Sequence, residues 1–310
     1  MKIKKNDSVM AALLLAASMA VTACSSSDDN ESPSFNTEAT IYAVGVQRSS
    51  TNKGDIATLW ADGKAVALTD GTTDAEASAV CLSASNVYVA GYVKNANGKE
   101  VATLWSNGRA QSLNDGTTDA RAMAVCTSGS DVYVAGTKYN DKGINVATVW
   151  KKGKALSLTD GTVDTGLYSI GLSGSDVYLG GFTTNDKGKI VATVWKNGKV
   201  QTLTDGTADA SVFSLSVSGG TLYAGGFTTH ASGNRISTVW TNGTPQLLSD
   251  GSHFESVEAI AASGSTVYAG GYVNNDKDNS VATLWKDGVP QSLLSSSEEA
   301  WIKGIAVREQ

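Results

Sequence analysis

The sequence predicts an all-β fold in which one four-stranded antiparallel unit is repeated around a ring. Tryptophans recur at a constant step of 45 residues, at Trp60, Trp105, Trp150, Trp195, Trp240 and Trp285. Tyrosines keep the same step, at Tyr88, Tyr133, Tyr178, Tyr223 and Tyr268. A period of this length is typical of β-propeller blades and matches no helical or coiled-coil pattern. We therefore expect a six-bladed β-propeller.

Each unit divides into four short segments that are rich in Val, Ala, Leu and aromatic residues and are separated by turn residues. In one unit, we expect strand A at about Ala77–Leu82, strand B at Val87–Val93, strand C at Glu100–Trp105 and strand D at Arg109–Leu113. Consecutive hairpins would join these strands into an antiparallel meander.

The turn between strands C and D carries the clearest local signal. Dipeptides such as Asn107-Gly108 and Asp62-Gly63 follow the tryptophan, and they suit a two-residue type I′ turn because both residues need positive φ. Only the third copy, Lys152-Gly153, departs from this pattern.

The ends of the repeat predict how the ring closes. The repeats begin at strand B, near Ile41, and the chain ends on Ile302–Val307, which aligns with strand A of the other units. We expect this C-terminal strand to pair with the three N-terminal strands and complete the sixth blade. Closure of this kind removes exposed sheet edges. Residues 39–310 are thus expected to form the propeller.

The N-terminus resembles that of an exported lipoprotein. Residues 1–23 combine early lysines, an apolar run and Val21-Thr22-Ala23 before Cys24, as in a lipoprotein signal peptide. We expect lipidation at Cys24, which would anchor the chain to a membrane, and a flexible tether at 24–38. The acidic stretch 25–29 is similar to the export signal of surface lipoproteins in some Gram-negative bacteria, which implies an outer-membrane protein exposed at the cell surface.

Charge and cysteine usage narrow the expected partners. Without residues 1–23 the chain has 21 basic and 29 acidic residues, a formal charge of −8. Nucleic acid is not expected as a partner, because phosphate binding needs a basic stripe. Cys81 and Cys126 lie one period apart and are expected to be buried free thiols rather than a disulfide. We expect a monomer with no cofactor and no required metal.

From about Ile41, the chain resembles repetitive six-bladed propellers of surface lipoproteins. Its Tyr followed by Gly-Gly, as in Tyr178–Gly181 and Tyr268–Gly271, is also similar to kelch-like repeats. Its turns are tighter than those of kelch repeats, and its Ala-Thr-Leu-Trp strand differs. The resemblance therefore implies architecture and no particular activity or partner.

Candidate binding residues lie where the repeats disagree. One aligned position of strand A reads Ser78, Met123, Tyr168, Phe213, Glu258 and Lys303. The position two before it reads Glu76, Arg121, Gly166, Ser211, Ser256 and Trp301. If strand A is innermost, these side chains gather at one mouth of the central channel. Drift of unconstrained loop ends is the alternative. The candidate ligand-binding residues are Tyr168, Phe213, Glu258, Trp301, Lys303 and Arg121.

Aromatic residues beside a few charges favour a non-enzymatic binding or scaffold protein that engages a glycan or a protein at this mouth. One alternative is a glycan-acting hydrolase or lyase, which would need converging carboxylates from Glu76, Glu255 and Glu258. Another is a multivalent lectin with one pocket per blade. No catalytic motif is recognisable, and we assign no catalytic residue.

The repeated Leu-Thr-Asp-Gly-Thr-x-Asp loop, as in Leu68–Asp74, also has two interpretations. Its aspartates could approach a calcium ion, or they could cap the backbone of a turn. The turn is the preferred interpretation.

Overall fold

The computed structural model describes residues 41–48, 54–83, 86–293 and 299–307. The predicted signal peptide at 1–23, Cys24 and the tether at 24–38 lie outside the described residues. Within the described ranges, no helix is long and apolar enough to cross a membrane.

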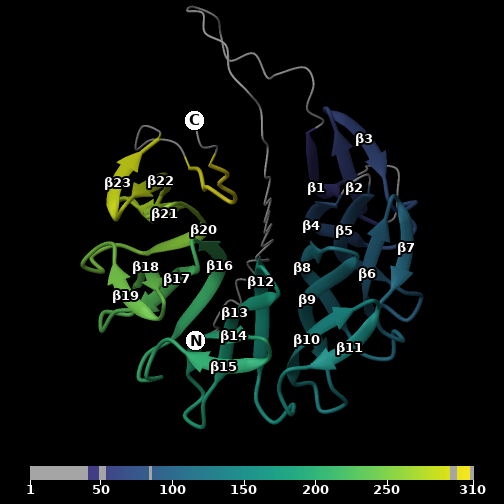
Figure 1. Cartoon of the computed structure of the whole chain (residues 1–310), viewed down its shortest axis with the longest axis horizontal. Coiled ribbons are helices and arrows are strands. Elements are labelled where there is room, and N and C mark those ends of the chain that lie inside the picture. Colours follow the sequence, from purple (N-terminus) through teal and green to yellow (C-terminus); the bar gives the residue numbers. More distant parts are fainter. Residues whose placement is uncertain (1–40, 49–53, 84–85, 294–298, 308–310) are drawn as a thin grey trace, which may run out of the picture.

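The described chain is built from antiparallel β-sheets arranged one after another around a ring (Figure 1). One sheet has three strands and five have four, and within each sheet the strands follow one another in sequence order. We call the three-stranded sheet β1–β3 blade 1, and the sheets β4–β7, β8–β11, β12–β15, β16–β19 and β20–β23 blades 2 to 6. The predicted all-β propeller class is confirmed.

Strand bounds repeat from blade to blade. Blade 1 consists of β1 (Tyr42–Gln47), β2 (Ile56–Ala61) and β3 (Lys64–Ala67). The innermost A strands of blades 2 to 6 are β4 (Ala75–Ser83), β8 (Ala120–Ser128), β12 (Thr165–Ser173), β16 (Ala210–Ser218) and β20 (Glu255–Ser263). The B strands are β5 (Asn86–Lys94), β9 (Asp131–Tyr139), β13 (Asp176–Thr184), β17 (Thr221–Thr229) and β21 (Thr266–Asn274).

The outer half of each blade is equally regular. The C strands are β6 (Glu100–Ser106), β10 (Asn145–Lys151), β14 (Ile190–Lys196), β18 (Arg235–Thr241) and β22 (Ser280–Lys286). The outermost D strands are β7 (Arg109–Ser112), β11 (Lys154–Ser157), β15 (Lys199–Thr202), β19 (Thr244–Leu247) and β23 (Val289–Ser292). The predicted strands of blade 2 are therefore confirmed to within a few residues.

The hairpin between strands C and D has the predicted backbone in every blade. Asn107 has φ 49° and Gly108 φ 80°, and the other copies repeat these values closely. Lys152, the one residue that departs from the Asn/Asp pattern, also has φ 50°. The repeated hairpin thus holds even a lysine in the left-handed region, where it is disfavoured.

The outer strands protect the sheet edges. Each is only four residues long and exposed. Four of them, β3, β7, β11 and β15, begin with Lys or Arg, and β19 and β23 contain Pro245 and Pro290. Short strands, positive charge and proline all oppose pairing with another chain.

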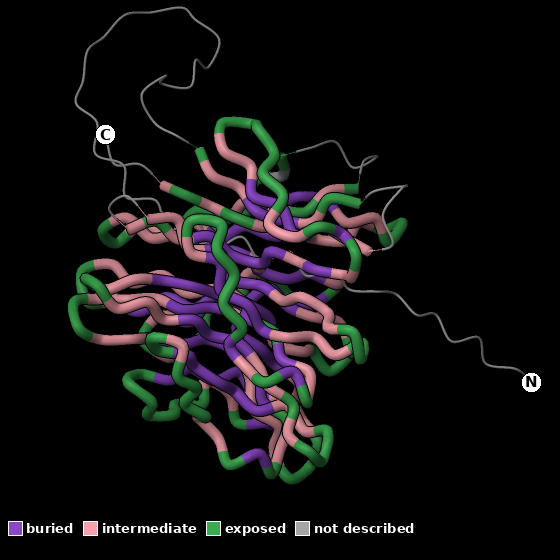
Figure 2. The backbone as a smooth tube through the Cα atoms, turned by 90° about the vertical axis from the view of Figure 1, so that its right-hand side faces the viewer, coloured by how far each residue is buried: buried purple, intermediate pink, exposed green. Residues whose placement is uncertain are grey.

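The core lies between neighbouring blades, and burial follows the inner strands (Figure 2). The repeated tryptophan is the largest element of this core: Trp150 is fully buried and packs with Ala90, Leu104 and Val125 of the preceding blade and its own inner strand. Trp105, Trp195, Trp240 and Trp285 are at most 1% exposed. These five tryptophans therefore pack blades together and offer no exposed face to a sugar, whereas Trp60 of blade 1 is half-buried.

The C-terminal segment 301–307 takes the place expected of the closing strand beside blade 6. A Cβ added to Gly270 would lie 2.6 Å from both Ile302 and Ile305. Gly225, one period earlier, meets Val257 and Ile260 of the following blade in the same way. The Ile302 N–H also donates to the Gly271 carbonyl at 3.2 Å. Within the described residues, the segment forms no regular β-ladder with β1.

Candidate functional site

The variable position of strand A is a β-bulge in each of blades 2 to 6. The register between strands A and B shifts at Ser78, Met123, Tyr168, Phe213 and Glu258. A bulge adds one residue to a strand and redirects its side chain. The positions at which the repeats disagree therefore share one backbone geometry, and the sequence alone did not reveal it.

A glycine opposite each bulge makes this geometry sterically feasible. A Cβ on Gly91, Gly136, Gly181, Gly226 or Gly271 would lie 1.8 to 2.0 Å from a carbonyl oxygen of the facing A strand. No larger residue fits so close to a backbone oxygen. The second glycine of the Tyr-x-Gly-Gly motif is thus required by the bulge.

A central cavity of about 400 Å³ is lined by the later halves of the A strands and by Ile305, Ala306 and Val307. The C-terminal segment therefore occupies the sixth place around the channel. In each strand, the bulged residue precedes the first lining residue by one to three positions. We call the end of the channel where the A strands begin the bulge-side mouth.

Aromatic side chains of blades 4 to 6 form two groups of contacting rings at this mouth. The Tyr168 ring centroid lies 5.3 Å from that of Phe213 and 6.0 Å from that of Phe182. Phe213 in turn lies 5.6 Å from Phe227, and Phe254 stacks on Tyr272 at 6.4 Å. We call these residues the aromatic arc: Phe182, Tyr168, Phe213, Phe227, Phe254 and Tyr272.

Arg235, the first residue of β18, joins the two parts of the arc. Its Cζ atom lies 4.0 Å from the Phe227 ring centroid and 5.2 Å from that of Phe254. Burial and the Glu258 carboxylate raise the pKa of Tyr272, and Arg235 opposes this rise. The arc therefore combines buried rings, Phe227 and Tyr272, with half-buried ones, and Arg235 lies against Phe227 and Phe254.

Next to the arc, Glu258 is paired with Lys303 at 3.0 Å, so that the C-terminal segment is tied to blade 6. Trp301, two residues earlier, has a 49% exposed side chain. Of the predicted site residues, the structure thus joins Tyr168 with Phe213, and Glu258 with Lys303.

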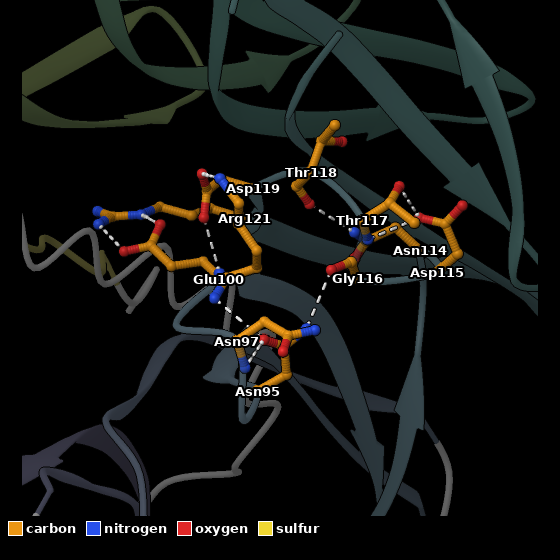
Figure 3. Close-up of polar contacts among 11 residues, drawn as sticks. Asn95, Asn97, Glu100, Asn114, Asp115, Gly116, Thr117, Thr118, Asp119 and Arg121 are labelled. Atoms are coloured by element: carbon orange, nitrogen blue, oxygen red, sulfur yellow. Dashed lines mark hydrogen bonds and ion pairs between the residues drawn. The ribbon is translucent and has the colours of Figure 1, made fainter. Parts of the chain in front are cut away.

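Arg121 belongs to a second, charged cluster in blades 2 and 3. Its guanidinium forms a bidentate pair with Glu100, with Nη2 to Oε1 at 2.6 Å (Figure 3). The guanidinium also lies 4.8 Å from the Tyr92 ring centroid. Burial raises the pKa of Tyr92 to about 12, and the Glu76 carboxylate contributes to the rise. Burial also raises the pKa of Glu76, which Arg121 counteracts.

The carboxylates proposed for hydrolysis have different surroundings. The electrostatic influences on Glu76 come from Arg121, Glu100 and Asp55. Glu255 is 1% exposed, and its Oε1 accepts hydrogen bonds from the Ser237 N–H at 2.9 Å and from the Ser249 hydroxyl. Glu255 therefore caps the backbone of blade 5.

The aspartates of the interblade loops act as turn residues. Oδ1 of Asp115 accepts hydrogen bonds from the backbone N–H and the hydroxyl of Thr117 (Figure 3). Asp119 Oδ1 accepts the Glu100 N–H at 2.9 Å, which links blade 3 to blade 2. Within the described residues, no cluster of three or more His, Cys, Asp or Glu residues is placed to hold a metal ion.

Cys81 and Cys126 are free thiols, as predicted, but only Cys126 is buried, and Cys81 is half-buried. Both line the central cavity. Burial raises the pKa of both thiols. The neutral thiol is therefore favoured, and the pair is poorly suited to nucleophilic chemistry.

Sequence reasoning missed Arg235 and the aromatic residues of strand B. The latter occupy one aligned position, which reads Tyr92, Thr137, Phe182, Phe227 and Tyr272. Aligning every strand, rather than strand A alone, would have shown that Arg235 breaks the repeat beside these rings.

The chain matches no protein-family model and no curated protein sequence. It does resemble solved propellers. The β-propeller domain of the Trilobed protease from Pyrococcus furiosus, described as having an open velcro topology, has a TM-score of 0.52 at 10% identity, over 83% of this chain and 81% of that one.

Two acylaminoacyl peptidase structures are also similar. One, in complex with Z-Gly-Gly-Phe-chloromethyl ketone, has a TM-score of 0.50 at 12% identity, and the other, from Pyrococcus horikoshii, 0.49 at 13%. Each match covers 78% of this chain and 42% of the peptidase chain, so this chain spans about two fifths of their length. At such identities the similarity extends to the fold alone, and the comparisons show a β-propeller.

Proposed function

We propose that this protein is a non-enzymatic binding protein that engages a glycan at the bulge-side mouth. The observation that carries the proposal is the aromatic arc, whose rings from three blades meet where the bulges direct variable side chains. Tyr168, Phe213 and Phe254 are half-buried, so that part of each ring remains available. Aromatic faces beside polar groups suit a sugar, which has both C–H and hydroxyl surfaces.

The residues around the arc supply the polar contacts that such a ligand needs. Glu258 and Lys303 form a half-buried ion pair, the Glu258 carboxylate influences the pKa of Tyr272, and the exposed Trp301 lies on the same segment as Lys303. Structural neighbours of this chain include propeller domains of peptidases, and a binding or scaffold role is compatible with that fold.

The test is a glycan array probed with the full-length protein in detergent, together with Tyr168→Ala and Phe213→Ala. Loss of one aromatic contact should weaken binding about tenfold, which corresponds to about 1.4 kcal/mol. Val200→Ala, on the exposed outer strand of blade 4, is the control and should leave binding unchanged. Unchanged binding in both aromatic variants would refute the site. Binding to no glycan would favour a protein ligand.

We further propose that the chain is an outer-membrane lipoprotein, anchored through Cys24 and exposed at the cell surface. The proposal is supported by the apolar run and Val21-Thr22-Ala23-Cys24 of the sequence. Cys24→Ser should abolish metabolic labelling with palmitate and release the protein from membranes. Ser25→Ala should leave labelling intact. Labelling that persists in Cys24→Ser would exclude this anchor.

A further inference from the structure

Arg235 differs from the other cations at the bulge-side mouth in its lack of an anionic partner. Arg121 is paired with Glu100, and Lys303 with Glu258. Among the described residues, no carboxylate forms an ion pair with Arg235. A half-buried charge without a counter-charge is costly, so that the site favours an incoming anion.

Arg235 interacts with the Tyr272 hydroxyl, and its five N–H donors exceed what that single contact uses. Phe227 and Phe254 lie against the guanidinium, with its Cζ 4.0 and 5.2 Å from the two ring centroids. The N–H groups of a guanidinium lie in its plane and form a fork that matches a carboxylate. Phe227 and Phe254 therefore contact the guanidinium without using its N–H donors, and the donors that do not meet Tyr272 remain for an anion.

Two tyrosine hydroxyls lie within electrostatic reach of the same guanidinium. Arg235 lowers the pKa of Tyr168 and of Tyr272, opposing the larger rise that burial causes in each. A neutral phenol donates or accepts a hydrogen bond. A ligand seated on Arg235 would thus meet aromatic faces and hydroxyls from blades 4 to 6.

Comparison of the blades argues against a purely structural role for this arginine. The equivalent first position of strand C is occupied by Glu100, Asn145, Ile190 and Ser280 in blades 2, 3, 4 and 6. These blades fold with the same strands and turns. The blade itself does not require an arginine here, and the residue occurs only where the arc surrounds it.

Building on the proposed function, we infer that Arg235 binds the anionic group of an acidic glycan, with the carboxylate of a uronic acid on its guanidinium and the sugar ring against the aromatic arc. The Glu258 carboxylate, which influences the pKa of Tyr272, is already paired with Lys303 at 3.0 Å. Local repulsion of the ligand is therefore small, although the whole chain is acidic.

The experiment measures binding of the full-length protein to oligogalacturonate, hyaluronan and alginate fragments, each compared with its carboxyl-reduced counterpart. Wild type should bind the acidic form at least about tenfold more tightly than the reduced form, as expected for one charge-assisted contact. Arg235→Gln should abolish this preference, and Arg235→Lys should retain part of it. Arg109→Gln, on the exposed outer strand β7, should leave the preference unchanged.

The ratio of the affinities for the acidic and the reduced glycan separates the two roles of Arg235, because loss of packing against the arc would weaken both forms equally. If Arg235→Gln weakened acidic and reduced glycans equally, the arginine would only position the arc, and the inference would be wrong. Equal affinity of wild type for both forms would overturn the inference and leave the proposed glycan-binding function standing. Binding of wild type to none of the acidic or reduced fragments would count against both.

Discussion

At the scale of single residues, one position of the repeat is occupied by different residues in different blades. The first residue of strand A is Ala75, Ala120 or Ala210 in three blades, but Thr165 in blade 4 and Glu255 in blade 6. Thr165 Oγ1 accepts the Ala147 N–H at 2.7 Å, and Glu255 Oε1 accepts the equivalent Ser237 N–H at 2.9 Å. The same backbone donor is thus satisfied by whichever polar side chain the sequence provides.

Glu255 makes stability depend on pH. Burial is the largest cause of its raised pKa in the folded protein. Above the unfolded value of 4.5, the folded state binds more protons than the unfolded one, so that stability falls as pH rises through the window up to the raised pKa. Glu255→Gln keeps an acceptor oxygen and cannot ionise. The Glu255→Gln variant should have a larger free energy of unfolding than wild type at about pH 7, and no larger one at about pH 4.

Urea unfolding at the two pH values checks this prediction. Glu299→Gln, at an exposed position, is the matched control. If Glu255→Gln raised the free energy of unfolding equally at both pH values, the charge of Glu255 would not be the cause of the added stability.

At the scale of the element, the bulge in strand A is the feature that turns a repeated blade into a variable mouth. Its partner glycine is constant while the bulged residue changes from Ser78 to Tyr168 to Glu258. A constant backbone thus presents a different side chain from each blade.

Substitution of the partner glycine should show how much this geometry matters. In Gly181→Ala the new Cβ would lie 1.8 Å from the Gly166 carbonyl oxygen, so that the strands must separate. We expect a loss of about 2 kcal/mol or more in the free energy of unfolding. Gly171→Ala is the control, because its nearest neighbours would be at 3.8 and 3.9 Å, and it should cost less than about 1 kcal/mol.

Chemical denaturation of both variants, with circular dichroism to confirm the sheet content, measures the difference. Equal stability of Gly181→Ala and Gly171→Ala would mean that strands A and B can relax around the added methyl group, contrary to the close approach described for the bulge.

At the scale of the whole molecule, the blades differ in the side chains that they place at the bulge-side mouth. The aromatic arc runs through blades 4 to 6, and the cluster of Glu76, Tyr92, Glu100 and Arg121 lies in blades 2 and 3. The C-terminal segment completes the channel wall through Ile305 and brings Lys303 to Glu258. The channel wall and the mouth therefore share residues of the C-terminal segment.

The sequence by itself determined the blade, the number of blades, the turns and the position of strand A at which variation accumulates. These features are local or periodic: a 45-residue step, an Asn-Gly hairpin and an alternating strand need no knowledge of distant contacts. The aspartate turns and the five buried tryptophans followed from the same reasoning, because a residue repeated from blade to blade has similar surroundings in most of them.

Only the tertiary structure decided which variable residues meet. Tyr168 and Phe213, one period apart, lie 5.3 Å from each other, whereas Arg121 pairs with Glu100 in another cluster and Glu255 is buried as a cap. Arg235 acquires its surroundings from Phe227 and Phe254, which come from other strands. Such contacts depend on the bulge, on the angle between blades and on side-chain packing, and a repeat period in one dimension specifies none of these.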